Sequence, residues 1–239
     1  MPHLSDEAIC VRHWDFSETS QTVSLFCRAG GMLRGLAKGA KRVGGRFSGG
    51  IDLLTLGQVV AITKPGRDLA TLTDWTLTRT WRSLRSDLAA NQAAYYLVDL
   101  VQRSLEQADP HPELFDALVE ALDRIEAGHA AEATLVFQWR LLDELGYAPR
   151  LDPTVGTGTS VHFSADGGGT VAEERPNAWK VRRTTVAFLA DVMSSADAAA
   201  VALAADRETL TRANRLLAAY VRHVLGTQPT TMRLLFPNL

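Results

Sequence analysis

The sequence has few cysteines and no long apolar segment. Cys10 and Cys27 are the two cysteines among 239 residues, and both lie in apolar-rich segments. They are too few for a disulfide scaffold, so we expect buried thiols. No run of about 18 consecutive apolar residues is present, which excludes a membrane-spanning helix. The first residues, MPHLSDEAICVRHW, have no basic region followed by an apolar one, so we expect no signal peptide and a cytoplasmic location.

Catalytic motifs are also missing. The histidines are scattered, at positions 3, 13, 111, 129, 162 and 223, and neither HExxH nor GxSxG occurs. The acidic residues of DLAANQ (87–92) and DALVEALDRIE (116–126) have the spacing of a solvated helix face rather than that of a paired catalytic site. We therefore expect no enzymatic activity, no catalytic residue and no cofactor.

Positive charge is concentrated in one place. The formal net charge is −2, from 25 Lys and Arg against 27 Asp and Glu, so any basic surface must be local. Residues 33–50, LRGLAKGAKRVGGRFSGG, contain no acidic residue and are called the basic strip below. Its glycines make the backbone pliable. Its cations are Arg34, Lys38, Lys41, Arg42 and Arg46.

The first 80 residues have the pattern of a small β-barrel. Gly30-Gly31 predicts a tight hairpin between the second and third strands. KPGRD (64–68) predicts a turn between the fourth and fifth. Five strands in this length fit a closed OB-type barrel. The predicted strands are short β-branched or aromatic segments at 8–14, 22–28, 32–39, 57–64 and 69–75.

From Trp81 onward the pattern becomes helical. Ser86 is the expected N-cap of the first helix, and Gly146 and Gly226 follow the expected ends of two others. The predicted helices cover 86–105, 109–128, 130–149, 179–193 and 206–226.

One segment interrupts this helical pattern. Residues 152–177 are rich in glycine and poor in apolar residues. With 46% hydrophobic residues the chain has enough for a core. The predicted fold is therefore α+β, with a five-stranded OB-type β-barrel at 1–80. A helical domain follows at 81–239, with an irregular insertion at about 150–177.

The basic strip allows three interpretations. It can be a solvated hairpin and loop, as many charge runs are. It can be a nucleotide phosphate loop, although it matches neither GxxxxGK[ST] nor a GxGxxG between a strand and a helix. It can also follow a nucleic acid backbone, where Lys and Arg neutralise phosphates. An OB-type barrel favours the last, because that fold binds single strands through a cationic groove with aromatic platforms.

Three aromatic residues are candidates for stacking on a base. Phe47 lies inside the basic strip, and Trp14 and Phe16 lie in or just after the first predicted strand. Each also fits the barrel core, which is the preferred interpretation for Trp14, whereas Phe47 fits either. The predicted nucleic-acid contacts are therefore Arg34, Lys38, Lys41, Arg42, Arg46 and Phe47.

In the order of its segments the chain resembles the RecO family of bacterial recombination mediators. The resemblance covers nearly the whole chain, and it is the ordered combination of segments that is specific. The matching segments are VRHWDFSETSQTVSLFCRAGGMLRGLAKGAKR (11–42), GRFSGGIDLLTLGQV (45–59), LATLTDWTL (69–77), AAYYLVDLVQRSL (93–105), HPELFDALVEALDRIEAG (111–128), FQWRLLDELGYAPRLD (137–152) and RLLAAYVRHVLG (215–226).

The resemblance implies a function and partners. Proteins of this family have an OB domain and a helical domain, bind single- and double-stranded DNA, and anneal complementary strands. With RecR they help to load the RecA recombinase onto DNA coated by single-strand-binding protein. The resemblance therefore implies that the cations of the basic strip contact DNA, and that the protein is cytoplasmic and nucleoid-associated.

The sequence departs from the family pattern at one place. Zinc-bearing relatives have CxxC after the GYAP-like segment, where this chain has Thr154 and Thr157. The second cysteine pair would fall near AEER (172–175), which also lacks cysteine. A tetrahedral zinc site needs four Cys or His ligands, and this region offers His162. We expect no metal site.

A partner site is expected in the helical domain, because relatives bind the acidic C-terminal tail of single-strand-binding protein there. Such a tail needs an apolar notch rimmed by cations. The candidate residues are Arg124, Arg140 and Phe115, although apolar side chains of this region also fit an interhelical core. Two other functional classes stay open from sequence: a protein-interaction module without direct DNA binding, and an enzyme with a glycine-loop phosphate site.

Overall fold

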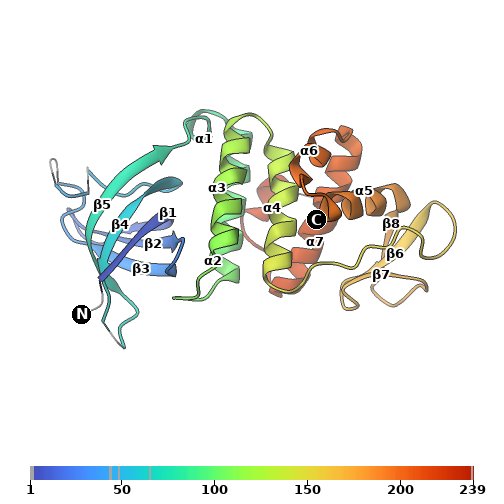
Figure 1. Ribbon diagram of the computed structural model, residues 1–239, viewed down its shortest axis with the longest axis horizontal. Coiled ribbons are helices and arrows are strands. Elements are labelled where there is room, and N and C mark those ends of the chain that lie inside the picture. Colours follow the sequence, from blue (N-terminus) through green and yellow to red (C-terminus); the bar gives the residue numbers. More distant parts are fainter. Residues whose placement is uncertain (1–2, 43–44, 48, 65, 238) are drawn as a thin grey trace. The chain divides into compact units, whose positions relative to one another are not determined.

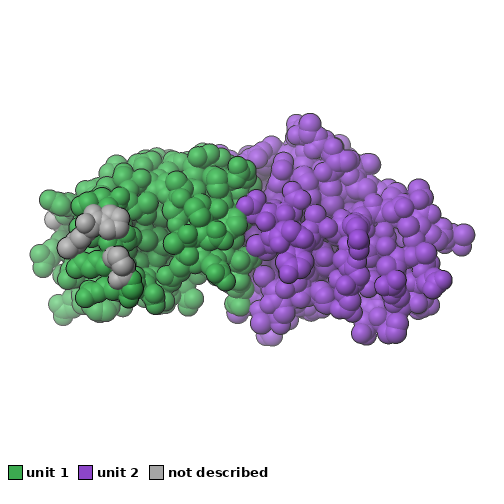
Figure 2. Space-filling model, turned by 60° about the horizontal axis from the view of Figure 1, so that its bottom comes forward, with its two compact units in different colours: residues 1–86, 101–119 green, residues 87–100, 120–239 purple. Residues whose placement is uncertain are grey.

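The computed structural model describes residues 3–42, 45–47, 49–64, 66–237 and 239. The chain forms two compact units, which Figure 2 shows in separate colours. The first consists of residues 1–86 and 101–119, and the second of residues 87–100 and 120–239. The first unit contains a β-barrel and the second is mainly helical, which confirms the predicted α+β class.

Five strands of the first unit close into a barrel (Figure 1). They follow the order β1-β2-β3-β5-β4, and β1 also pairs with β4 to complete the ring. Among the described residues, β3 and β5 pair in parallel, and the other strand pairs of the barrel are antiparallel. The OB-type prediction is confirmed. The strands are β1 (His3–Asp15), β2 (Gln21–Cys27), β3 (Gly31–Ala37), β4 (Thr55–Ile62) and β5 (Ala70–Thr80).

The hairpin predicted at Gly30-Gly31 is present. Gly31 has φ +67°, and a Cβ at this position would collide with the backbone of Asp109. Glycine is therefore required at position 31 for two reasons: its positive φ, and the close approach of the Asp109 backbone. Of the predicted turn at 64–68, residue 65 lies outside the described residues, and Gly66 has φ +73°.

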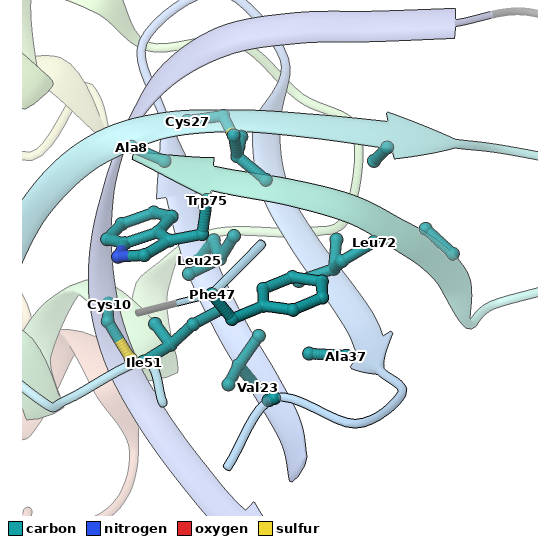
Figure 3. Close-up of a cluster of buried hydrophobic side chains, with 14 residues drawn as sticks. Ala8, Cys10, Val23, Leu25, Cys27, Ala37, Phe47, Ile51, Leu72 and Trp75 are labelled. Carbon is teal, nitrogen blue, oxygen red and sulfur yellow. The ribbon is translucent and has the colours of Figure 1, made fainter. Parts of the chain in front are cut away.

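The barrel core includes part of the long β3–β4 connection. Trp75 and Leu72 of β5 face Val23 and Leu25 of β2 in the interior (Figure 3). Three residues of the connection join them and close the barrel: Ala40, Phe47 and Ile51, each at most 5% exposed. Burying a phenylalanine contributes about 1.5–3 kcal/mol, so the connection is held by its apolar side chains.

Residues 101–119 belong to the same unit and pack on the barrel. Gln102 Nε2 donates to the carbonyl of Val11 at 2.8 Å, and the amide of Ala108 donates to the carbonyl of Met32 at 3.1 Å. Arg28 forms two hydrogen bonds with Asp116, at 2.8 and 2.6 Å. These residues come from the end of α2 (Leu88–Ser104), the loop after it and the start of α3 (Pro112–Glu126).

The helices begin and end close to the predicted limits, with one correction. Asp87, not Ser86, caps α2: its carboxylate accepts from the amide of Ala90 at 3.0 Å. At the other end of the chain, Gly226 ends α7 with φ +65°, as predicted. The remaining helices are α1 (Ser83–Ser86), α4 (Ala130–Glu144), α5 (Arg183–Ser194), α6 (Ala198–Leu203), α7 (Arg207–Leu225) and α8 (Met232–Leu235).

A buried polar network joins three helices of the second unit. Tyr96 of α2 donates its hydroxyl hydrogen to Gln138 Oε1 at 3.0 Å, and Gln138 Nε2 donates to Asn214 Oδ1 at 3.0 Å. Asn214 in turn donates to the carbonyl of Ala131 at 3.0 Å. Because burial without partners would cost each polar group free energy, these bonds fix how α4 and α7 pack.

The insertion was predicted to be irregular, but it has regular secondary structure. It contains a three-stranded antiparallel sheet of order β7-β6-β8, formed by β6 (Ser160–Ser164), β7 (Gly169–Val171) and β8 (Trp179–Arg182). The predicted helix at 179–193 is therefore wrong in its first turn, since α5 begins at Arg183. Trp179 stacks on Phe163 with ring centroids 5.5 Å apart, and this contact anchors β8.

Arg183 organises the loop that contains Thr154 and Thr157. Its guanidinium donates to the carbonyls of Pro153 and Gly158, the latter at 2.8 Å, and to those of Val155 and Gly156 at 3.3 Å. Among the described residues, no three His, Cys, Asp or Glu side chains are grouped as metal ligands would be. One positively charged side chain thus gathers these carbonyls.

Candidate nucleic-acid interface

Arg34 and Lys38 lie at the start of the basic strip. Arg34 is on β3 opposite Ser24 of β2, and Lys38 follows the last residue of β3. Both are exposed. Because strand side chains alternate, Arg34 points away from the barrel core that Ala37 enters.

Lys41 differs from its neighbours. Its ammonium lies 2.6 Å from Asp15 Oδ1, and its side chain is 31% exposed. Asp15 therefore neutralises part of the charge that was expected to meet a phosphate. Arg42 is exposed, and its side chain lies over Gly39. A Cβ atom at position 39 would contact the Cδ and Nε atoms of Arg42. Residues 43, 44 and 48 of the strip lie outside the described residues.

Arg46 and Phe47 are adjacent but point in opposite directions. Arg46 is exposed, and its carbonyl accepts from the amide of Trp75 at 3.3 Å. Phe47 is 5% exposed and packs in the barrel core (Figure 3). The prediction that Phe47 contacts nucleic acid needs correction, because its ring has no free face for a base. Ala40 and Phe47, both buried in the barrel core, anchor the part of the strip that follows β3.

The exposed aromatic residues Trp14 and Phe16 flank Asp15, the residue that pairs with Lys41. Trp14 is 37% exposed and Phe16 64%, although the core interpretation was preferred for Trp14. The cause is a β-bulge between Cys10 and Arg12 of β1. Ala8 and Cys10 point into the core, and simple alternation would send Arg12 and Trp14 inward too. The extra residue at the bulge reverses the alternation and turns both outward.

Arg12 is a candidate contact that sequence reasoning missed. It lies opposite Ser24, which lies opposite Arg34, so the two arginines share a row across β1, β2 and β3. The guanidinium of Arg12 also lies 4.6 Å from the ring centroid of Trp14. In the sequence, Arg12 and Trp14 are two residues apart, which indicates that they share one face of a strand. Only the bulge shows that this face is the outer one.

These side chains line a shallow pocket of about 360 Å³ in the first unit. Its cations come from Arg12 and Arg34, its aromatic surface from Trp14, and its polar amides from Gln102 and Gln107. Guanidinium groups can bind phosphate in a bidentate manner, and an exposed indole can stack on a base of any identity. The name barrel face is used below for two sets taken together: Arg12, Trp14 and Arg34 of this pocket, and the exposed strip cations Lys38, Arg42 and Arg46.

The two cysteines take no part in this surface. Both are buried in the barrel. Burial raises the pKa of Cys10 to about 12 and raises that of Cys27 as well. Neither thiol is therefore ionised near neutral pH, which agrees with the expectation of inert buried thiols.

The three residues expected to bind a partner have different surroundings. Phe115 is fully buried in the first unit and packs edge-to-face on Phe26, with centroids 5.5 Å apart, so its predicted partner contact is corrected to a core role. In the second unit, Arg124 pairs with Glu120 at 2.7 Å. Arg140 is exposed and lies 4.5 Å from the ring centroid of Trp139.

The closed barrel and the helices that follow it make the chain an α+β protein with an N-terminal OB-type domain. Two protein-family models match most of the chain. The model described as Recombination protein O N terminal matches residues 1–81, and the model described as Recombination protein O C terminal matches residues 85–233. The chain belongs to the RecO family.

Curated relatives agree, and each is named DNA repair protein RecO. One from Rhodopirellula baltica is 37% identical over 179 residues, 71% of this chain and 66% of the relative, just under two thirds of its length. One from Salinibacter ruber is 34% identical over 72% of this chain and 68% of the relative. One from an Anaeromyxobacter species is 29% identical over 98% and 96%. The RecO family is thus a family of DNA repair proteins.

No helix in the described parts of the chain combines the length and the apolar character that crossing a membrane requires.

Proposed function

We propose that this chain is a non-enzymatic recombination mediator in DNA repair. It binds single- and double-stranded DNA and promotes the annealing of complementary strands. With RecR, it assists the loading of RecA onto DNA coated by single-strand-binding protein, in the cytoplasm and in association with the nucleoid. Membership of the RecO family and the barrel face support this function.

The observation that carries the proposal is the composition of the barrel face. Its cations are exposed although the chain has a net charge of −2, and one of them, Arg12, lies over the exposed ring of Trp14 on the outside of an OB-type barrel. Cations neutralise phosphates and release condensed counterions, while the indole stacks on a base. The residues of the barrel face lie on strands and on the β3–β4 connection, and they include no helix that could enter a DNA groove and contact base edges. Binding should therefore depend weakly on the DNA sequence.

Within the second unit, a pocket is a candidate site for the acidic tail of single-strand-binding protein. It has a volume of about 330 Å³, and small apolar side chains such as Ala89 and Ala93 line it with the ring of Phe236. Arg215 lies at the same pocket. An apolar recess beside a cation fits a tail whose charges need pairing when its apolar end is buried. Arg124 and Arg140 remain candidates for further contacts with the tail.

The test is a salt series with a labelled oligonucleotide. Each phosphate contact contributes about −0.7 to the slope of log K against log salt on a single strand. Replacing Lys38, Arg42 and Arg46 by alanine should therefore flatten the slope by about two units. A matched variant, Arg82→Ala with Arg85→Ala and Arg103→Ala, removes three exposed cations elsewhere in the first unit and should change the slope less.

A strip variant that melts like the parent and keeps its slope would contradict the proposal. If the parent itself binds no DNA at low salt but binds the acidic tail, the chain is a protein-interaction module instead.

A further inference from the structure

A second concentration of cations lies in the second unit. Figure 1 shows β8 beside α5 in the C-terminal part of the chain, and with α7 they border a groove of about 500 Å³. Five of the 25 Lys and Arg residues of the chain line it. We call these the groove cations: Lys180, Arg182, Arg212, Arg215 and Arg222.

Regular secondary structure places these charges in rows. Lys180 and Arg182 are two residues apart on β8, so they share one face of the strand. Arg212, Arg215 and Arg222 occupy one stripe of α7, because residues three and seven apart fall on the same helix face. At 1.5 Å per residue the stripe extends over about 15 Å. Such a length fits a ligand with repeated charges rather than a single small anion.

The acidic side chain of Glu208 offsets part of this charge. Glu208 contacts Arg212, and it lies 4.0 Å from Arg182. Both arginines are thereby positioned on the side of the groove near the start of α7. Lys180 and Arg215 are exposed and Arg222 is half-buried, so their head groups line a surface that a ligand can reach.

The floor between the cations is made of small and aliphatic side chains. Leu216 and Ala219 of α7 contribute to it, and Trp179 of β8 also lines the groove. Trp179 is held in place by its stack on Phe163. Apolar side chains beside cations from a strand and a helix fit a polynucleotide strand, whose phosphates meet the cations while sugars and bases lie against the apolar side chains.

We propose that this groove is a second nucleic-acid site, which binds the phosphate backbone of a strand independently of the barrel face. The proposal extends the proposed function, because a protein that brings two strands together needs to hold both. The ligand class is a polynucleotide bound without regard to sequence. Four of the five cations are arginines, whose planar forks match phosphate oxygens.

The test counts how many short oligo(dT) strands one full-length chain binds at low salt. Oligo(dT) cannot pair with itself, so each equivalent reports a protein site. The parent should bind two equivalents. The groove variant, Lys180→Ala with Arg215→Ala and Arg222→Ala, should bind one equivalent, at the barrel face. The barrel-face variant, Lys38→Ala with Arg42→Ala and Arg46→Ala, should also bind one equivalent, at the groove. Arg182 and Arg212 are left in place because they contact Glu208.

A matched control removes the same charge from the same unit. Arg175→Ala, Arg207→Ala and Arg233→Ala replace three exposed arginines that do not line the groove, and this variant should still bind two equivalents. If the triple groove variant melts below the parent, the double variant Lys180→Ala and Arg215→Ala replaces only exposed side chains and should show the same loss.

The outcomes separate the two sites. A folded groove variant that still binds two equivalents overturns the inference. So does a parent that binds one oligo(dT) strand while it binds an aspartate-rich peptide that the variant Lys180→Ala and Arg222→Ala no longer binds, since the groove is then a peptide site. Arg215 is left out of this comparison because it also lines the proposed tail pocket. If the barrel-face variant binds two equivalents and the groove variant one, the barrel proposal fails and the groove site stands.

Discussion

The guanidinium of Arg12 lies over the indole ring of Trp14, 4.6 Å from its centroid, on the outside of the barrel. A cation over an aromatic face is attracted by the ring quadrupole, so the pair holds Trp14 in one orientation. The other face of an indole exposed in this way can accept a base. The pair therefore links the cationic and the aromatic parts of the barrel face.

Trp14→Ala should weaken the binding of single-stranded DNA without unfolding the barrel. Stacking of a base on an aromatic side chain is worth about 1–3 kcal/mol, so affinity should fall by roughly 5- to 150-fold. The salt slope should change little, because no phosphate contact is removed. Fluorescence anisotropy over a salt series measures both quantities.

Phe47→Ala is the informative comparison. Phe47 is 5% exposed, and truncation of a buried phenylalanine costs about 3–5 kcal/mol of stability. This variant should melt well below the parent. If Trp14→Ala melts as low as Phe47→Ala, or binds DNA as tightly as the parent, the stacking role of Trp14 is wrong.

The ion pair between Lys41 and Asp15 predicts a gain of binding. Asp15→Asn removes the carboxylate that lies 2.6 Å from the Lys41 ammonium and frees that charge for a phosphate. Binding should tighten at low salt, and the salt slope should steepen by up to about 0.7 on a single strand. The double variant Asp15→Asn with Lys41→Ala should lose the steeper slope. Equal slopes in the single variant and the parent would show that Lys41 meets no phosphate.

Much of the fold could be predicted from local pattern. β-branched segments between turn residues located all five barrel strands, and helical spacing located α2, α3, α4 and α7. The segment at 179–182 was missed because a short strand of alternating apolar and basic residues, WKVR, directly precedes a helix. Its strand character comes from pairing with β6, a contact that local pattern does not contain.

The site was predicted less well, for a reason that residues 10–14 illustrate. Composition located the cations of the strip, but the direction of a strand side chain depends on register. The bulge after Cys10 turned Trp14 outward, and closure of the barrel by the β3–β4 connection drew Phe47 inward. The two aromatic residues exchanged their expected roles, because both outcomes depend on tertiary pairing rather than on sequence spacing.

Gly31→Ala should destabilise the first unit. The left-handed conformation alone costs a non-glycine residue about 1–2 kcal/mol, and the new Cβ would also collide with the backbone of Asp109. Gly66→Ala is a matched control, since Gly66 has φ +73° but no atom near the position of a Cβ. Thermal unfolding should show a larger loss at Gly31. Equal losses would mean that the loop at Asp109 adjusts without cost.

The Arg28–Asp116 pair predicts a dependence of stability on pH. Hydrogen bonds from Arg28 hold the pKa of Asp116 below its usual value. A carboxyl whose folded-state pKa is lowered stabilises the fold above its unfolded pKa of about 3.9, and the contribution is lost as pH falls through the folded pKa. Asp116→Asn should therefore be less stable than the parent near neutral pH, and the difference should narrow under acid conditions.

Urea unfolding at neutral and at acid pH measures this effect. Asp68→Asn, at an exposed position of the same unit, serves as the control. A difference between Asp116→Asn and the parent that stays constant as pH falls would show that the pair does not respond to protonation of Asp116.

Arg183 provides the last prediction, because its guanidinium gathers the carbonyls of the loop at 153–158. Arg183→Ala should expose those carbonyls to water and loosen the loop, so amides of 153–170 should exchange hydrogen faster than in the parent. Arg183→Lys should restore little, since an ammonium lacks the planar fork that reaches several acceptors at once. Arg175→Ala, at an exposed position of the same insertion, should leave exchange unchanged. The same measurement with a metal chelator distinguishes the cation that holds the loop: the parent should keep its protection, whereas faster exchange after chelation would mean that a bound metal, and not Arg183, orders the insertion.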